Sequence, residues 1–531
     1  MKTESQEPME LNQNNLLFTI AGTALLASCT GTEKTVNTKP LNIVYIMTDD
    51  HTRQMMSSYD NSNIETPNLD RIAKGGVLFD NAFVANSISG PSRACLVTGK
   101  HSHKNGKLDN HTTFDGNQQT VQQLLKGAGY QTAMIGKWHL DSTPTNFDFW
   151  EILPGQGDYY NPVFITPEGN IKHEGYVTDI ITDKSLEWLE NGRDKENPFC
   201  LFIHHKAIHR NWMGDTAHLA LYEDKVFDLP DNFYDDYDGR VAAAEQEMSI
   251  ASDHDMDIVN DLKMKREGVE TRLSRSYVNG TYARMNDAQK AAWDKHYDPI
   301  IEEFYAANLK GKELAEWKFQ RYMRDYAKTV KSLDENVGRV LDYLEANDML
   351  ENTIIMYTSD QGFYMGEHGW FDKRFMYEES FSTPLVMHLP SHLKKRGNIS
   401  LMVQNIDFAP TMLDLAGVAI PEDIQGVSLL PLLKDDIKPE NWRKSLYYHY
   451  YEFPAEHMVK RHYGVRTERY KLIHFYDDID TWELYDLKND ISEMHNLYGQ
   501  AEYDDITKEL KAELKRLQEQ YDDPIREGFP Q

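Results

Sequence analysis

Residues 42–50 read NIVYIMTDD, a continuous apolar run that ends in the two carboxylates Asp49 and Asp50. An apolar run of this length is typical of a parallel strand that is buried on both faces of a sheet. Open α/β sheets bind their ligands at the carboxyl ends of such strands. The run therefore predicts an α/β fold, and it predicts the edge of the sheet where a site should lie.

The same pattern recurs three times further along the chain. Thr132–Ile135 (TAMI) precedes the sequence GKWH, and Phe199–His204 (FCLFIH) precedes a second basic stretch, HKAIHR. Thr353–Thr358 (TIIMYT) precedes Asp360 and Gln361. Four strands that each end in polar or cationic side chains predict one shared site.

Helical patterns lie between these strands. Apolar side chains recur every three or four residues from Tyr326 to Leu344, just before the fourth strand. The alternation predicts a large, doubly wound mixed sheet flanked by helices. The segment from about Trp212 to Lys318 is charged, helix-prone and poor in strands, and we interpret it as an insertion that walls one side of the site.

The composition changes after about Ile437. Tyr447–Tyr451, Tyr470–Phe475 and Thr481–Tyr485 are short, aromatic-rich runs that are typical of strands, and Ile506–Tyr521 has leucines on one helical face. We therefore expect a smaller antiparallel sheet closed by a helix. The predicted organisation is a leader and linker at 1–40, a catalytic domain at 41–436 and a C-terminal α+β subdomain at 437–531.

Length and charge limit the class of protein. The chain has 531 residues, 40% of them hydrophobic, and a formal net charge of −29. This charge argues against nucleic acid as a partner, because a phosphate backbone needs a basic surface. Cys95 and Cys200 are the only cysteines after the leader, and we expect both to be buried free thiols.

The N-terminal segment predicts export. Leu16–Ser28 (LLFTIAGTALLAS) is apolar but short for a membrane span, as in the hydrophobic region of a signal peptide. It leads into Cys29 through a sequence that resembles a bacterial lipobox, which implies a lipid anchor on that cysteine in the periplasm or at the cell surface. Lys2 is the sole basic residue before this run, so the translation start stays open. The alternative is a buried helix.

The most specific stretch is SGPSRACLVTG, from Ser89 to Gly99. It resembles the signature of type I sulfatases in the alkaline phosphatase superfamily: Cys or Ser, any residue, Pro, Ser, Arg, a short spacer and Thr-Gly. The resemblance extends over nearly the whole chain after residue 41. It implies that a maturase oxidises Ser89 to formylglycine. The alternative interpretation is a Gly-Pro turn that caps a helix.

A formylglycine nucleophile suits sulfate esters for a chemical reason. Its hydrate carries two hydroxyls on one carbon, so one oxygen can attack sulfur. The other can then expel sulfate by losing its proton, which restores the aldehyde. This covalent route divides one difficult step into two easier ones.

Oxygen donors at the strand ends predict a metal site. Three carboxylates and an amide suit a hard divalent cation, Ca²⁺ first, and the family places its metal at the matching positions. Many members have Asn or His where Gln361 stands, and an Asp pair alone would also fit a solvated helix N-cap. The predicted ligands of a single Ca²⁺ are Asp49, Asp50, Ser89, Asp360 and Gln361.

The resemblance also implies cations and histidines on the other side of the pocket. Arg93 is expected to brace the diol oxygens. Lys137 and His139 match the family's lysine and histidine at the corresponding strand end, and His139 is the expected base that takes the diol proton. His209 matches the histidine that meets the sulfate or the leaving group, and Lys373 matches the lysine that binds the sulfate and the leaving oxygen; this pair is expected to assist the leaving group. The roles of three further histidines near these positions stay open, with a structural role as one interpretation, and they are not counted among the site residues: His204, His205 and His368.

Three further stretches resemble bacterial N-acetylglucosamine-6-O-sulfatases. They are 147–162 (FDFWEILPGQGDYYNP), 204–212 (HHKAIHRNW) and 359–374 (SDQGFYMGEHGWFDKR). This likeness implies removal of 6-O-sulfate from N-acetylglucosamine in heparan, keratan or mucin chains. The expected sugar contacts are Arg210, Trp212, Arg374 and His457.

Other functions fit parts of the sequence. A sulfatase for another sulfated sugar is the nearest alternative. The same fold hosts phosphomonoesterases and phosphonate ester hydrolases, but these usually need two metals and further Asp or His ligands. A glycan-binding lipoprotein with unmodified Ser89 would have no need for so many cationic residues in the pocket.

Overall fold

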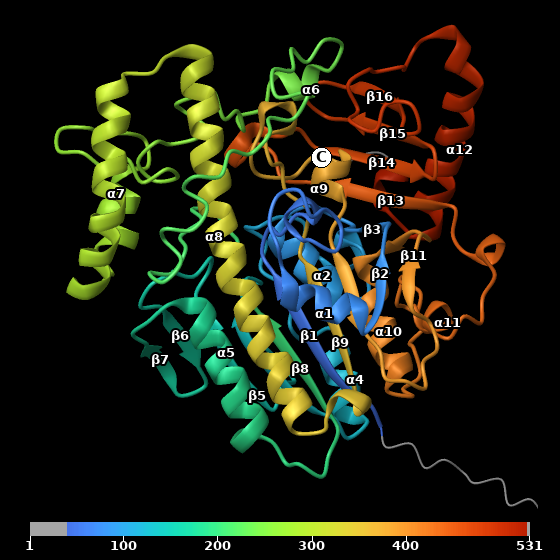
Figure 1. Ribbon diagram of the computed structural model, residues 1–531. Helices are drawn as coiled ribbons and strands as arrows, with labels where there is room; N and C mark the ends of the chain where they lie inside the picture. The colour runs from blue at the N-terminus through green and yellow to red at the C-terminus, as the bar shows by residue number, and fades with distance from the viewer. Residues whose placement is uncertain (1–39, 528–531) are drawn as a thin grey trace, which may run out of the picture. The chain divides into compact units, whose positions relative to one another are not determined.

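The computed structural model describes residues 40–527, and the four predicted strands form the centre of its ten-stranded sheet (Figure 1). They are β1 (Asn42–Thr48), β4 (Gln131–Lys137), β8 (Phe199–His204) and β9 (Thr353–Ser359). These strands lie in the order β9-β1-β8-β4 and pair in parallel, so their carboxyl ends meet at one edge. The predicted strands and their shared edge are confirmed.

Shorter strands, none of them predicted, extend the sheet on both sides. Beyond β9 lie β10 (Leu385–His388), β2 (Gly76–Phe79) and β11 (Gly397–Ile399). Beyond β4 lie β5 (Phe149–Leu153), β6 (Val163–Thr166) and β7 (Gly169–Lys172). Antiparallel pairs at β10, β6 and β7 make the sheet mixed. A separate two-stranded sheet joins β3 (Ala82–Phe83) to β12 (Val403–Gln404).

Helices cover both faces of the large sheet, as predicted, and α8 crosses in front of the strands in Figure 1. Alternate residues of β1 supply the two cores: Val44 and Ile46 pack on the side of α8, and Tyr45 and Met47 pack on the side of α10. One face carries α1 (Pro67–Lys74), α5 (Val177–Glu187) and α8 (Gly311–Ala346). The other carries α2 (Ser89–Thr98), α4 (Val121–Gly127) and α10 (Phe408–Leu415).

The predicted insertion combines long irregular segments with helices and contains no strand of the described sheets. It includes α6 (Val241–Ala244) and α7 (Asp287–Ala307) and leads into α8. A capping box starts α7: the side chain of Asn286 accepts from the backbone of Gln289, whose side chain accepts from the backbone of Asn286. Short helices elsewhere are α3 (Ser102–Asn105), α9 (Glu378–Phe381) and α11 (Leu430–Leu433).

A four-stranded antiparallel sheet follows, as expected, with α12 (Asp504–Gln520) packed against one face (Figure 1). Its strands are β13 (Ser445–Tyr450), β14 (His462–Thr467), β15 (Tyr470–Phe475) and β16 (Thr481–Asp486). The second of them was not predicted. The described residues from Pro40 onward form one compact unit, so the division at residue 437 stays a prediction.

Cys95 and Cys200 are buried free thiols, as expected, and burial raises the pKa of Cys95 to about 12. Across residues 40–527, no helix combines the length and apolar character that a bilayer span requires. The predicted signal peptide and the predicted anchor at Cys29 lie outside the described residues.

Candidate active site

Side chains from three strand ends and one helix meet in a buried cluster. The carboxyl ends of β1, β4 and β9 deliver acidic, cationic and amide groups, and α2 brings the predicted nucleophile to them. Each side chain belongs to a residue that is at most 1% exposed. The cluster comprises Asp49, Asp50, Ser89, Lys137, Asp360 and Gln361.

Ser89 lies at the start of α2, where the helix offers unpaired backbone N–H groups. Its hydroxyl donates to Asp49 Oδ1 at 3.1 Å. The helix ends at Gly99, whose φ of 66° is a left-handed conformation that glycine adopts at little cost. The positive end of this helix favours an anion next to Ser89.

The amide of Gln361 lies among the carboxylates. Its Nε2 donates to Asp50 Oδ1 at 2.5 Å and to Asp360 Oδ1 at 2.7 Å, while its Oε1 has no hydrogen-bond partner among the described residues. Rotating the side-chain amide so that Oε1 and Nε2 exchange places would direct Oε1 toward the space between the carboxylates. Asp49, Asp50 and His209 also offer ligand atoms that lie within 4.8 Å of one another. This donor set fits a hard divalent cation.

Burial and mutual repulsion disfavour the charged forms of these acids. Burial raises the pKa of Asp50 to about 7, against the attraction of Lys373. Burial also raises the pKa of Asp360, and Asp49 adds to this effect. Burial opposes ionisation of Asp49 as well, but Lys137 and other cations hold its pKa well below the usual range. A bound cation would relieve the repulsion among the three groups.

Each carboxylate has a close cationic partner, and Arg93 also lies 3.9 Å from Asp49. Lys373 Nζ lies 2.6 and 2.7 Å from the two oxygens of Asp50. Arg93 donates from Nη2 and Nε to Asp360 Oδ2 at 2.9 and 3.2 Å. The third pair joins Lys137 to Asp49. The predicted cations are therefore beside the predicted metal ligands.

Two of the predicted histidines border this cluster. His139 Nδ1 has no hydrogen-bond partner within the described chain, and burial together with Lys137 lowers its pKa well below the usual value. Burial and Lys137 likewise lower the pKa of His209. His209 Nδ1 donates to the carbonyl of Arg210 at 2.7 Å, so its Nε2 carries the lone pair. Both imidazoles are neutral and able to accept a proton.

Comparison with known families assigns the chain. Residues 41–418 match the family model described as "Sulfatase", and residues 366–520 match "N-sulphoglucosamine sulphohydrolase, C-terminal". This chain belongs to the sulfatase family.

Individual relatives agree with that assignment. An N-acetylglucosamine-6-O-sulfatase of Bacteroides thetaiotaomicron is 53% identical over 97% of this chain and 92% of that protein. A protein solved in complex with its substrate D-glucosamine-2-N,6-O-disulfate is 52% identical with a TM-score of 0.88, covering 93% of this chain and all of that one. The predicted fold and the predicted class, a sulfuric ester hydrolase, are confirmed.

More distant structures share the fold alone. The phosphonate monoester hydrolase of Agrobacterium radiobacter is 18% identical with a TM-score of 0.63, over 91% of this chain and 96% of that one. The scaffold therefore does not distinguish sulfate from phosphonate chemistry, and the site must do so.

The side chains of His204 and His368 have polar partners in the protein, whereas His205 Nδ1 has no hydrogen-bond partner among the described residues. His204 Nδ1 lies 3.4 Å from an Arg93 guanidinium nitrogen, behind the cluster. Burial lowers the pKa of His205 to about 3. His368 Nδ1 lies 2.7 Å from Asp235. The contacts of His204 and His368 favour structural roles for these two side chains.

A buried polar network adjoins Lys373. Arg374 pairs with Asp372, whose Oδ2 lies 3.3 Å from His457 Nε2. His457 Nδ1 donates to the carbonyl of Glu247 at 2.5 Å, which fixes the ring. Two predicted sugar contacts thus share Asp372, which the sequence analysis missed although it directly precedes Lys373.

Trp212 does not reach the site, which corrects our expectation that it contacts the sugar. It is 0% exposed, and its ring centre lies 4.5 Å from that of Tyr322 and 6.1 Å from that of Phe371. The side chain has no surface that a sugar could touch. A tryptophan beside a functional loop fits the core as well as a ligand, and the sequence alone does not distinguish the two.

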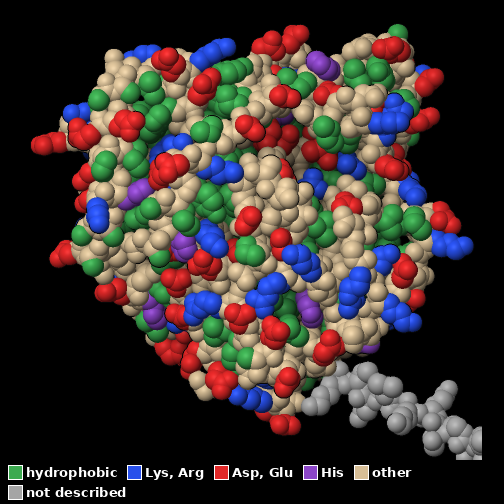
Figure 2. Space-filling view, viewed as in Figure 1, with side chains coloured by type: hydrophobic (Ala, Val, Ile, Leu, Met, Phe, Trp, Pro, Cys, Tyr) green, Lys and Arg blue, Asp and Glu red, His purple; other side chains and the backbone are tan. Residues whose placement is uncertain are grey.

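A polar cavity of about 270 Å³ opens beside His209. Lys206 and the predicted sugar contact Arg210 line it, and Arg210 pairs with Asp261 at 2.7 Å and with Glu456 at 3.0 Å. The insertion contributes Asn260, Leu273, Ser276 and Thr281 to the wall, as predicted. On the face of the molecule that Figure 2 shows, acidic and basic side chains are interspersed.

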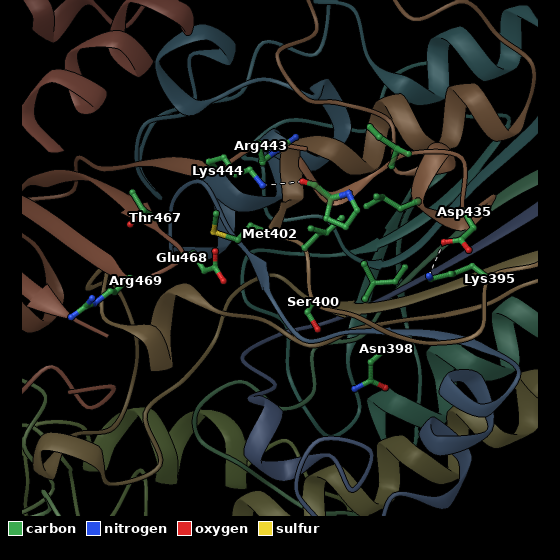
Figure 3. A pocket seen from close by; sticks show the side chains of 15 residues that line it. Lys395, Asn398, Ser400, Met402, Asp435, Arg443, Lys444, Thr467, Glu468 and Arg469 are labelled. Atoms are coloured by element: carbon green, nitrogen blue, oxygen red, sulfur yellow. Dashed lines mark hydrogen bonds and ion pairs between the residues drawn. The ribbon is translucent and has the colours of Figure 1, made fainter. Parts of the chain in front are cut away.

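A larger cavity, of about 700 Å³, lies near β11, α11 and the turn between β14 and β15 (Figure 3). Its cations already have partners: Lys395 lies 2.8 Å from Asp435, and Lys444 donates to the carbonyl of Pro439 at 2.9 Å. The lining includes none of the predicted site residues. The cavity beside His209 is therefore the candidate substrate pocket, because predicted site residues line it.

Proposed function

We propose that this sulfatase removes 6-O-sulfate from N-acetylglucosamine in sulfated glycans, with formylglycine made from Ser89 by a maturase and with one Ca²⁺. The position of Ser89 carries the chemistry: its Oγ lies 3.1 Å from Asp49, at the start of a helix and among paired carboxylates and cations. The substrate is supported by 53% identity, over 97% of the chain, to a relative named for it.

The proposed roles of the site residues follow from their charges. Ca²⁺ bound by Asp49, Asp50, Asp360, Gln361 and oxidised Ser89 would supply positive charge that favours an ionised hydroxyl and a polarised sulfate. Once the carboxylates have that partner, Lys137, Lys373 and Arg93 are available to bind the sulfate oxygens. Neutral His139 then accepts the hydroxyl proton, while His209 and Lys373 assist the leaving oxygen.

The number of metal sites favours sulfate over phosphate chemistry. Within residues 40–527, a single group of acidic and histidine side chains is close enough to share an ion. Two-metal phosphoesterases clamp both the attacking and the leaving oxygen between ions about 3.5–4 Å apart. Here the cations beside the one acidic group suit a sulfate ester.

The network of Asp372, Arg374 and His457 is the group that we assign to the sugar hydroxyls. Asp372 can accept hydrogen bonds and Arg374 can donate them, and both directly flank Lys373 in the chain. A 6-O-sulfate stands one methylene away from its ring. A pocket for that ester must hold the ring at a fixed greater distance from Ser89, and a rigid buried network suits that task.

We expect sulfate release to be fastest from 6-sulfated N-acetylglucosamine. A ring sulfate in this pocket would shift the sugar and leave buried polar groups unpaired, a mismatch that can cost about 10⁴-fold in selectivity. The measurement is free sulfate from 6-O-, 3-O- and N-sulfated glucosamines, 6-sulfated N-acetylgalactosamine and 6-sulfated galactose. Faster release from any of the others would contradict the substrate assignment, and preferred release of phosphate from 6-phosphorylated N-acetylglucosamine would contradict the sulfatase chemistry.

We also propose that the protein is exported and anchored by a lipid on Cys29. The apolar run Leu16–Ser28 before that cysteine supports this. Cys29→Ala or globomycin treatment should move the protein from the membrane to the soluble fraction, whereas Cys200→Ala should not, because that thiol is buried in β8. An unmodified chain found wholly in the cytosol would refute the anchor.

A further inference from the structure

Lys206 is a buried ammonium group without an acidic partner. It follows β8, is 4% exposed, and donates from Nζ to the carbonyl of Gln156 at 3.1 Å. Its Nζ also lies 4.7 Å from the centre of the Tyr159 ring. No ion pair joins it to any Asp or Glu of the described chain. Burial, with Lys137 nearby, lowers its pKa to about 8, so the group is mostly protonated at neutral pH.

The other charges around the same cavity are already compensated. Asp158 lies 2.9 Å from Arg284, and Arg210 pairs with Asp261 and Glu456. Lys206 has three N–H donors, and its hydrogen bond to Gln156 uses one of them. A buried charge without a counterion destabilises the folded protein. Such a charge is typical of a binding site, where a ligand supplies the opposite charge.

Gln156 links Lys206 to the sulfate site. Its side-chain Oε1 accepts a hydrogen bond from Lys137, and its backbone carbonyl accepts one from Lys206. His209, beside Asp50, lines the same cavity as Lys206. One glycan could therefore place a sulfate at Lys137 and a second group at Lys206.

We propose that Lys206 binds a second anionic substituent of the glycan, in a subsite separate from that of the sulfate that is cleaved. This assignment rests on the proposed 6-O-sulfatase function. The shared ligand chemistry is an oxyanion that accepts charge-assisted hydrogen bonds from the ammonium group. Either a sulfate on the glucosamine nitrogen or the carboxylate of an adjoining uronic acid provides it.

The test compares substrates with one and with two anions. Lys206→Gln removes the charge and keeps a polar side chain, and Lys206→Arg keeps the charge. We expect Lys206→Gln to lower kcat/KM by about tenfold or more, through a higher KM, on one of two substrates. These are 2-N,6-O-disulfated glucosamine and 6-sulfated N-acetylglucosamine linked to glucuronate. The substrate whose kcat/KM falls identifies the source of the anion. Activity on 6-sulfated N-acetylglucosamine alone should stay within about twofold, which also reports that the variant folds, and Lys206→Arg should restore most of the loss.

Lys444→Gln is the matched control, because it removes the same charge beside the distant cavity of Figure 3. It should leave all three activities unchanged. An equal loss on all three substrates in Lys206→Gln, or no loss on any, would overturn the subsite. A wild-type enzyme that releases no sulfate from any of them would instead overturn the proposed function, and the subsite with it.

Discussion

Ser89→Ala is expected to abolish sulfate release while the protein stays folded. The only side-chain hydrogen bond that Ser89 donates goes to Asp49, and alanine is a better helix former at the first turn of α2. The variant lacks the hydroxymethyl group that a maturase would oxidise, so the covalent route has no nucleophile. Loss of a catalytic nucleophile costs on the order of 10⁶-fold in kcat in other hydrolases.

Several measurements separate lost chemistry from lost structure. Ser185→Ala is the control, because Ser185 is also a buried helical serine, bonded to the carbonyl of Ile181 at 2.7 Å in α5. Both variants should melt cooperatively near the wild-type temperature, and the control should retain activity. Mass spectrometry of the peptide that contains Ser89 should show the loss of two hydrogens only after expression with a maturase. More than a trace of sulfate release by Ser89→Ala would contradict the assignment.

Ser89→Cys extends the same prediction to the modification itself. Cysteine is the other residue that the family signature allows at this position. The variant should be active only in a host that oxidises cysteine, and wild-type protein made without a maturase should be as inert as Ser89→Ala. Equal activity of modified and unmodified protein would contradict the role of formylglycine.

The central strands could be predicted because a strand that is buried on both faces has a continuous apolar sequence. Asn42–Thr48 and Phe199–His204 are continuous apolar runs, and β1 and β8 have these same bounds. The edge strands have no continuous apolar sequence of this kind. All four residues of β7 are exposed, and β14 (HYGVRT) mixes charged and apolar residues, so neither has a pattern that distinguishes it from a loop.

The site was predictable to the extent that its residues follow those strands directly. Asp49 and Asp360 meet because β1 and β9 are parallel neighbours, and parallel order follows from the alternation of helices and strands. Asp372 and Lys206 were missed for a different reason. What makes each of them notable is its partners, or the lack of one, and side-chain pairing depends on segments that are far apart in the sequence. The burial of Trp212 depends on the same long-range packing.

The charges of the cluster balance without a metal or a substrate. Three carboxylates and three cations form three pairs. Adding a divalent cation alone would leave two positive charges in excess, and a sulfate ester and an ionised hydroxyl each bring one negative charge. The complete site is therefore neutral again only when ion, nucleophile and substrate are all present, which favours their binding together.

Asp360→Asn tests this balance directly and is expected to remove both the metal and nearly all activity. Asparagine keeps the size of the side chain and an oxygen that can accept from the backbone N–H of Asp50, which Asp360 Oδ1 does at 3.2 Å. The change therefore removes one charge and the hydrogen bonds that Oδ2 accepts from Arg93, and it keeps the volume of the side chain. Loss of a residue that only hydrogen-bonds to a metal ligand lowers metal affinity by up to about 100-fold. Loss of a carboxylate ligand itself should lower Ca²⁺ affinity by more than this, because only two carboxylates remain.

The readouts for Asp360→Asn are calcium content by metal analysis, the rise in melting temperature on adding Ca²⁺, and sulfate release. Wild-type protein at about 100 times its dissociation constant in Ca²⁺ should gain about 2.7 kcal/mol of stability, and the variant should gain much less. Asp334→Asn is the control, because Asp334 is equally buried but caps α1 through the backbone N–H of Leu69 at 2.9 Å, away from the cluster. It should lower stability without changing calcium content. Undiminished Ca²⁺ in Asp360→Asn would show that the carboxylate of Asp360 is not a ligand, and its pair with Arg93 would then be a structural salt bridge beside the ion.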